Sequence, residues 1–113
     1  MASTGLKGSY RLTDSAVDSN VTQTSAGAYA LGRLEDEKFL VSYIGRSDDN
    51  VNARLKQHVG DYDRFKYGYF SSPKTAFEKE CNLYHDFDPP DNKIHPARPN
   101  NSNWTCPRCS KFD

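Results

Sequence analysis

The feature that most constrains the fold is a strand-like run that stops at a glycine and is followed at once by a helical pattern. Residues 39–44 (FLVSYI) are β-branched and aromatic, and this run ends at Gly45. A short polar turn follows, and apolar residues then recur at helical spacing over residues 50–59. Arg54 and His58, four residues apart, fall beside that apolar stripe. We therefore expect a strand that leads into a short amphipathic helix carrying a cation and an imidazole.

Similar patterns place the other elements. Residues 28–34 form a second strand candidate, joined to the first by a polar hairpin turn at residues 35–38. Residues 65–70 (FKYGYF) are expected to form a third strand with aromatic alternation. Ser72 is expected to cap a helix over residues 73–87, which begins with a proline. The order ββαβα predicts an α+β domain with a small, mainly antiparallel sheet of three strands flanked by helices.

The two ends of the chain lack such patterns. Residues 1–25 are rich in Ser, Thr, Asp and Gly, and we expect a flexible arm there, with at most one short strand near residues 10–12. The domain proper is expected over residues 26–92. A tail rich in Pro and Asn follows over residues 93–113 and carries a pair of cysteines.

Composition narrows the class of protein. With 113 residues, 35% of them hydrophobic, the chain suits one domain with a small core. A formal net charge of zero argues against broad, non-specific DNA binding, although it leaves room for a local basic cleft. No apolar run approaches the ~20 residues of a membrane span, so no membrane partner is expected. We expect a cytoplasmic protein, in which the paired cysteines serve metal or redox chemistry before a structural disulfide.

Helical phase separates two glutamates of the second helix. When that helix is projected at ~100° per residue, Glu80 falls on the apolar arc and Glu78 falls on the polar side. A carboxylate on an apolar face is costly unless it is paired or binds a metal ion. Two interpretations of Glu80 therefore stay open: an ion pair with an arginine at the edge of the core, or a metal ligand. The apolar arc contains Ala76, Phe77, Leu83, Tyr84 and Phe87.

Several short motifs occur in a fixed order along the expected domain. The tripeptide Gly-Ala-Tyr at 27–29 lies in one expected strand, and Tyr-Ile-Gly at 43–45 lies in the next. Asn92 lies twelve residues after Glu80. In these features residues 26–92 resemble the GIY-YIG nuclease domain, with Ala in place of the usual Ile in the first motif. The positions that match are Tyr29, Tyr43, Arg46, Arg54, His58, Glu80 and Asn92.

The resemblance implies a metal-dependent endonuclease that hydrolyses DNA phosphodiester bonds. Tyr29 would activate or orient the attacking water, with Tyr43 close by on the next strand. Because a phenol has a pKa of ~10, such a base would need a nearby cation, which Arg46 or Arg54 could supply. Arg54 would bind the scissile phosphate with its planar fork. His58 would assist proton transfer or orient a tyrosine.

The same resemblance implies a cofactor and supporting contacts. Glu80 would hold a catalytic Mg²⁺, or Mn²⁺, that also contacts the phosphate. Arg46 and Asn92 would contact the substrate or support the site. The partner would be DNA, in repair or restriction. Because the chain has no excess of positive charge, a partner protein or a homodimer would position it.

A second constellation lies in the tail. The CPRC segment at residues 106–109 resembles half of a zinc ribbon, and structural zinc requires four ligands. Cys81 and His85 lie four residues apart at the edge of the apolar arc of the second helix, and His95 is the alternative to His85. We expect a structural Zn²⁺ that pins the tail to this helix. The expected ligands are Cys81, His85, Cys106 and Cys109.

Three functions stay open from the sequence. The first is a stand-alone endonuclease, and the second is a non-catalytic DNA-binding or assembly module on the same fold. The third is a zinc or redox module in which the CPRC segment is the working part. All the matched catalytic positions are filled, which favours the first function over the second. The third leaves Glu80 on an apolar face without an explanation.

Overall fold

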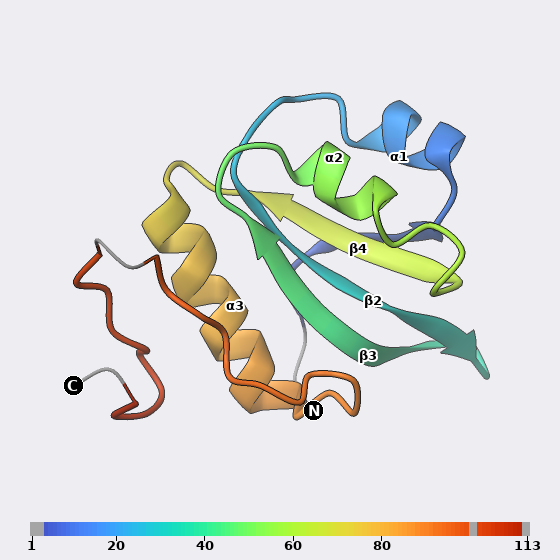
Figure 1. Ribbon diagram of the computed structural model, residues 1–113. Coiled ribbons are helices and arrows are strands. Elements are labelled where there is room, and N and C mark those ends of the chain that lie inside the picture. The colour runs from blue at the N-terminus through green and yellow to red at the C-terminus, as the bar shows by residue number, and fades with distance from the viewer. Residues whose placement is uncertain (1–3, 100–101, 112–113) are drawn as a thin grey trace.

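The computed structural model describes residues 4–99 and 102–111 of the chain (Figure 1). The expected arm and tail extend in part beyond these residues, at 1–3, 100–101 and 112–113. The elements in chain order are β1 (Lys7–Arg11), α1 (Asp14–Asn20), β2 (Gly27–Glu35), β3 (Lys38–Ser47), α2 (Val51–Lys56), β4 (Arg64–Tyr69) and α3 (Pro73–Phe87).

Four strands form one antiparallel sheet in the order β1-β4-β2-β3. The expected α+β class is confirmed, but the expectation of three strands was wrong because β1 pairs with the outer side of β4. The hairpin between β2 and β3 is confirmed. Its turn has φ of +51° at Asp36 and +65° at Glu37, the positive values of a primed hairpin turn. β3 is left as one edge of the sheet.

The segment that was expected to be a flexible arm is folded over residues 4–25. Thr13 caps α1, and Val17 of this helix is fully buried. Leu12 and Val21, on either side of α1, are buried in the same core cluster. The sequence gives little sign of this helix because it has seven residues and one buried side chain. Long-range packing stabilises such a short helix, which would be marginal by itself.

Side chains of β2 alternate between two layers. Tyr29 and Leu31 join the cluster under α1 and α2, whereas Ala30 packs with Ile44 and with Leu83 of α3. Figure 1 shows α1 and α2 on one side of the sheet and α3 on the other. Strand alternation therefore places Tyr29 on the α2 side. The larger cluster contains Leu12, Val17, Val21, Tyr29, Leu31, Val51, Leu55, Phe65 and Tyr67.

Helix α2 ends earlier than the expected range of 50–59. The N–H of Gln57 donates to the carbonyl of Arg54 at 3.2 Å, and that of His58 donates to the carbonyl of Leu55 at 3.0 Å. These bonds join residues three apart, so the last turn is tighter than an α-helix. His58 consequently lies in the turn after α2 rather than on the helix itself.

Helix α3 has the expected bounds. Ser72 and Thr75 form a capping box at its start, and a proline occupies the first turn. After the helix, the tail turns back and runs along the outer side of α3 (Figure 1). Among the helices of residues 4–99 and 102–111, none has the length and apolar content needed to cross a membrane.

Candidate functional site

A cavity of about 240 Å³ lies at the β3 side of the sheet. Its walls come from β2, β3, α2 and α3, with one residue from the tail, so side chains from both layers meet there. A larger cavity of about 450 Å³ lies elsewhere and is lined by none of the expected site residues. The smaller cavity is lined by Tyr29, Tyr43, Gly45, Arg46, Asp48, Arg54, Glu80 and Ala97.

The ring of Tyr29 reaches this cavity because its neighbour on the next strand is a glycine. Tyr29 and Gly45 are directly opposite in the pairing of β2 with β3. A Cβ atom at Gly45 would lie 2.5 Å from both Cζ and Oη of Tyr29, closer than such atoms can approach. Gly45 therefore has a physical reason for ending the second motif, since any other residue would displace the tyrosine ring.

Tyr29 is paired with His58. The Tyr29 hydroxyl lies 3.0 Å from His58 Nε2. Burial raises the pKa of Tyr29 well above its usual value, Tyr43 adds to the rise, and Arg54 opposes it. Burial also lowers the pKa of His58. At neutral pH the pair is therefore a neutral phenol hydrogen-bonded to a neutral imidazole, and the phenol is the donor when the imidazole proton is on Nδ1. The expected lowering of the tyrosine pKa by a cation is not found, because burial outweighs the charge of Arg54.

The other tyrosine of the cavity has a free hydroxyl. The ring of Tyr43 lies 5.5 Å from that of His58 and 6.3 Å from that of Tyr62, measured between centroids. Within the described part of the chain, no residue hydrogen-bonds the Tyr43 hydroxyl. Tyr62, which the sequence did not single out, donates its hydroxyl to Asp91 at 2.8 Å. The aromatic stack orients Tyr43 and leaves its hydroxyl available to a ligand.

Arg54 is an exposed cation on the wall of the cavity. Across residues 4–99 and 102–111, no carboxylate forms an ion pair with it. Its charge nevertheless acts on the groups around it, since it opposes the rise in pKa at Tyr29 and Tyr43. A guanidinium in this state can offer both of its donor edges to an anion such as a phosphate.

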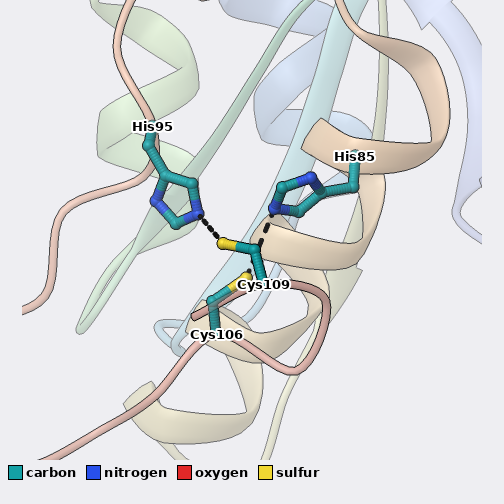
Figure 2. A group of neighbouring side chains, drawn as sticks. All are labelled: His85, His95, Cys106 and Cys109. Atoms are coloured by element: carbon teal, nitrogen blue, oxygen red, sulfur yellow. Dashed lines mark hydrogen bonds between the residues drawn. The ribbon is translucent and has the colours of Figure 1, made fainter. Parts of the chain in front are cut away.

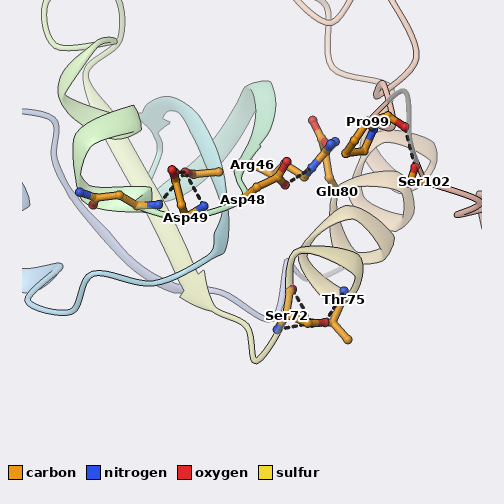
Figure 3. A network of polar contacts seen from close by, with 10 residues as sticks. Arg46, Asp48, Asp49, Ser72, Thr75, Glu80, Pro99 and Ser102 are labelled. Atoms are coloured by element: carbon orange, nitrogen blue, oxygen red, sulfur yellow. Dashed lines mark hydrogen bonds and ion pairs between the residues drawn. The ribbon is translucent and has the colours of Figure 1, made fainter.

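Glu80 is held by Arg46 (Figure 3). Arg46 Nη1 donates to Glu80 Oε1 at 2.7 Å, and its Nε donates to Asp48 at 2.9 Å. The guanidinium also lies 5.0 Å from the centre of the Phe77 ring. Burial raises the pKa of Glu80 to about 7, and the bond from Arg46 opposes that rise. The interpretation of Glu80 as the partner of an arginine at the core edge is confirmed. Arg46, expected to bind substrate, is instead engaged by two carboxylates.

Two carboxylates share this corner, and both accept hydrogen bonds from Arg46. Glu80 Oε1 is used by Arg46, whereas no described residue hydrogen-bonds Oε2. Mg²⁺ is commonly bound through one or two carboxylates together with phosphate oxygens and water. Glu80 and Asp48 are the carboxylates that line the cavity. Arg46 lies between the two carboxylates and is the cation with which a metal ion would compete.

The Asn92 side chain hydrogen-bonds the backbone of β3 and does not reach the cavity. Its Oδ1 accepts from the N–H of Ile44 at 2.7 Å, and its Nδ2 donates to the carbonyl of Ile44 at 2.9 Å. The side-chain amide thus pairs with the free edge of β3 as another strand would. Asn92 does not line the cavity. The expected role in supporting the site fits this geometry, and the expected contact with substrate does not.

Four potential metal ligands gather between α3 and the tail (Figure 2). Cys106 Sγ lies 3.4 Å from His85 Nε2, and Cys109 Sγ lies 3.3 Å from His95 Nε2. All four ligand atoms lie within 4.8 Å of one another. The edges of a tetrahedral zinc site are about 3.3–3.8 Å for such ligands, so the group could bind a metal ion such as zinc. Partial burial lowers the pKa of His85, which favours the neutral imidazole that a metal requires.

The ligand set differs from the expected one. His95 joins His85 rather than replacing it, and Cys81 is outside the group. Cys81 is fully buried in a cluster with Phe77 and Cys106. Burial raises the pKa of its thiol, and Cys106 adds to the rise. Helical spacing alone suggested Cys81, whereas the path of the tail brings His95 to the site instead.

Comparison with known proteins adds no relative. No protein-family model, no curated protein and no solved structure matches this chain. The family suggested by the motifs therefore stays a prediction, and the site is interpreted from its own chemistry.

The structure adds three residues that the sequence reasoning missed. Asp48 follows the second motif in a polar turn, where its charge could have marked it as a partner for Arg46. Tyr62 and Ala97 carry no such signal, because loops bring them to the site. Each of the three lines the cavity or contacts a residue that does.

Proposed function

We propose that the protein is a metal-dependent endonuclease that hydrolyses DNA phosphodiester bonds in the cavity at β3. The observation that carries this proposal is that Tyr29, which is hydrogen-bonded to His58, lines the same cavity as Arg54 and Glu80. No described carboxylate neutralises this arginine. A proton acceptor, an anion site and a carboxylate are the groups that such hydrolysis requires.

The tyrosine and the histidine work as a relay in this proposal. Tyr29 at its raised pKa is not a phenolate at neutral pH, so it cannot take a proton from water unaided. As its oxygen accepts a proton from the attacking water, its own proton passes to Nε2 of His58. His58 is neutral and can receive it. Tyr43, whose hydroxyl is free, orients the water or the phosphate.

Arg54 and Glu80 would supply the electrostatic stabilisation of the reaction. Arg54 binds two oxygens of the scissile phosphate and offsets the negative charge that develops during attack. Mg²⁺ held by Glu80, with Asp48 beside it, would supply Lewis-acid stabilisation of the phosphate and the leaving oxygen. Arg46 orients the Glu80 carboxylate. Because the chain has no net charge, a partner protein or a second copy of the chain positions it on DNA.

One observation favours the alternative of a non-catalytic DNA-binding or assembly module. Arg46 already forms an ion pair with Glu80, so a metal ion is not needed to explain the position of this carboxylate. In such a module Arg54 would still bind a phosphate, and the tyrosines would pack against DNA. The two functions differ in whether Mg²⁺ and Glu80 are needed for a chemical step.

The test is cleavage of plasmid and branched DNA by the purified protein, with Mg²⁺ and with EDTA. Glu80→Gln should abolish cleavage at every Mg²⁺ concentration, while DNA binding survives because Arg54 remains. Glu78→Gln is the matched control on the same helix and should cut at the wild-type rate. Arg54→Lys keeps the charge but loses the fork, so it should bind DNA and cut poorly. Full activity of Glu80→Gln would remove Glu80 and its metal ion from the reaction. Binding without Mg²⁺-dependent cleavage by the wild type would overturn the endonuclease proposal and favour the module.

We also propose that the metal bound by the His/Cys group is a structural Zn²⁺. Two thiolates and two imidazoles are a common ligand set for tetrahedral structural zinc. The three cysteines are free, as a cytoplasmic, reducing environment would keep them. The ion would then join the tail to α3.

A further inference from the structure

We propose that a zinc ion bound by His85, His95, Cys106 and Cys109 also holds the tail against β3, and thereby fixes one wall of the cavity. This inference rests on the proposed zinc ion, and it is independent of whether the protein cleaves DNA. It makes the metal group in the tail a positioning element for the cavity.

The residues just before the tail are fastened to the edge of β3. Asn92 pairs with both backbone groups of Ile44, and the N–H of Asp91 donates to the carbonyl of Ser42 at 3.0 Å. Asp91 also accepts from Tyr62, whose ring stacks on Tyr43 of the cavity. The residues from which the tail departs therefore contact the strand that carries the second motif.

The next residues connect this attachment to the metal group and to the cavity. His95 lies three residues after Asn92, and Ala97, which lines the cavity, follows two residues later. The rings of His95 and Tyr84 lie 5.3 Å apart, which places the imidazole against α3. A residue of the cavity wall therefore lies two residues from a proposed zinc ligand in the chain.

A second connection runs through the aromatic cluster. Arg98 Nη1 donates to the carbonyl of Trp104 at 2.6 Å. The Trp104 ring lies 5.5 Å from that of Phe77. The guanidinium of Arg46 lies over the Phe77 ring. Movement of residues around Cys106 would therefore disturb the packing beneath the Arg46–Glu80 pair.

Apart from the metal group, α3 holds the tail through an ion pair between Arg108 and Asp86 and through the packing of Trp104 on Phe77. The tail forms no helix or strand over residues 93–99 and 102–111. Ile94 is 79% exposed, and the buried side chains within these two ranges are few, with Pro96 and Cys106 among them. Segments with few buried apolar contacts open locally at low cost. A metal ion that ties His95 to two cysteines and to α3 would supply the missing stability.

The experiment compares amide hydrogen exchange in the zinc-loaded protein and in the same protein after chelation under reducing conditions. The reporter is the amide of Ile44, which bonds to the Asn92 side chain rather than to another strand. Chelation should accelerate its exchange by about tenfold or more, while amides of the central strand β2 stay protected. Emission of Trp104, the single tryptophan, should shift to longer wavelength as its ring leaves Phe77. Added Zn²⁺ should reverse both changes.

Two variants identify the ligands. His95→Ala should lower zinc affinity. Without any chelator, this variant should show the hydrogen-exchange pattern of the chelated wild type. Cys81→Ala is the matched control on α3, and it should retain one zinc ion per chain and a protected Ile44 amide. Zinc content of the purified variants is measured by elemental analysis.

Three results would overturn the inference. Unchanged Ile44 exchange after complete removal of zinc would show that the tail stays in place without the metal. Equal acceleration at Ile44 and throughout β2 would show that the ion holds the whole domain instead of the tail. Loss of zinc in Cys81→Ala with full retention in His95→Ala would show that the ligand set is different. None of these readouts depends on DNA cleavage, so a failure here is separate from a failure of the endonuclease proposal.

Discussion

The cavity and the His/Cys group share helix α3, which contributes Glu80 to the first and His85 to the second. Most of the cavity is built on paired strands and helices, so register and helical phase fix its side chains. The His/Cys group has one ligand on a helix and three on a segment without regular structure. The cavity is therefore expected to keep its shape by packing, whereas the His/Cys group is expected to need its metal ion.

Electrostatics differ between the two regions as well. In the cavity, charges are compensated within the protein, since Arg46 is engaged by Glu80 and Asp48. Arg54 is the exception, because it has no ion-pair partner in the described ranges. In the His/Cys group, the two thiols and two imidazoles are neutral without a metal ion. A bound cation would be balanced by the two cysteines as thiolates. The first region can therefore fold without a metal ion, whereas the second is expected to depend on one.

The largest effect should come from removing the zinc ligands of the tail. Replacing both Cys106 and Cys109 by Ser should abolish zinc binding and lower the melting temperature measured by calorimetry. Zinc at structural sites can supply roughly 10–16 kcal/mol of binding free energy, part of which stabilises the fold. A chelator should lower the melting temperature of the wild type and leave the double variant unchanged. A zinc-free double variant that melts like the zinc-loaded wild type would show that the two regions do not differ in this way.

The next largest effect should be a difference in cleavage between variants of two tyrosines that are paired across β2 and β4. Tyr29 and Tyr67 are directly paired, and each makes one hydrogen bond through its hydroxyl, to His58 and to the carbonyl of Asn20. Tyr29→Phe and Tyr67→Phe should each lower the free energy of unfolding by about 1 kcal/mol, as measured in urea. Cleavage should fall about 10²–10⁴-fold in Tyr29→Phe alone, because the proton relay is lost. Equal activity in the two variants would remove Tyr29 from the reaction.

The smallest effect should be a pH dependence at Glu80. Its folded pKa of about 7 is above the value of 4.5 for a free carboxyl, so the folded state binds the proton more tightly. The stability that this group contributes is fully present below about pH 4.5 and is lost as the pH rises through about 7. Glu80→Gln lacks this titration. The difference in unfolding free energy, wild type minus variant, should therefore decrease between pH 5 and pH 8, by on the order of 1–3 kcal/mol. A difference that increases over this range would show that Arg46 outweighs burial.

The sequence by itself determined the elements that depend on local signals. Helix α3 and its Ser72 cap, the hairpin of β2 and β3, and the opposite phases of Glu78 and Glu80 all follow from periodicity and turn chemistry. Most residues of the cavity were also named from the sequence, through the motifs that carry the resemblance, whereas Asp48 and Ala97 were not. The tight approach of Tyr29 to Gly45 is a direct result of the pairing of β2 with β3.

Only the tertiary structure decided the features that depend on distant segments. Strand β1 and helix α1 are too short to be stable alone. They form because β1 pairs with β4 and because α1 packs its buried side chain into the core. Arg46 was expected to bind substrate, but the packing of α3 on β3 brings it to Glu80. His95 rather than Cys81 completes the His/Cys group, since the path of a loop does not follow any periodic pattern. Local spacing orders residues along one element, whereas the meeting of two elements depends on how the core packs.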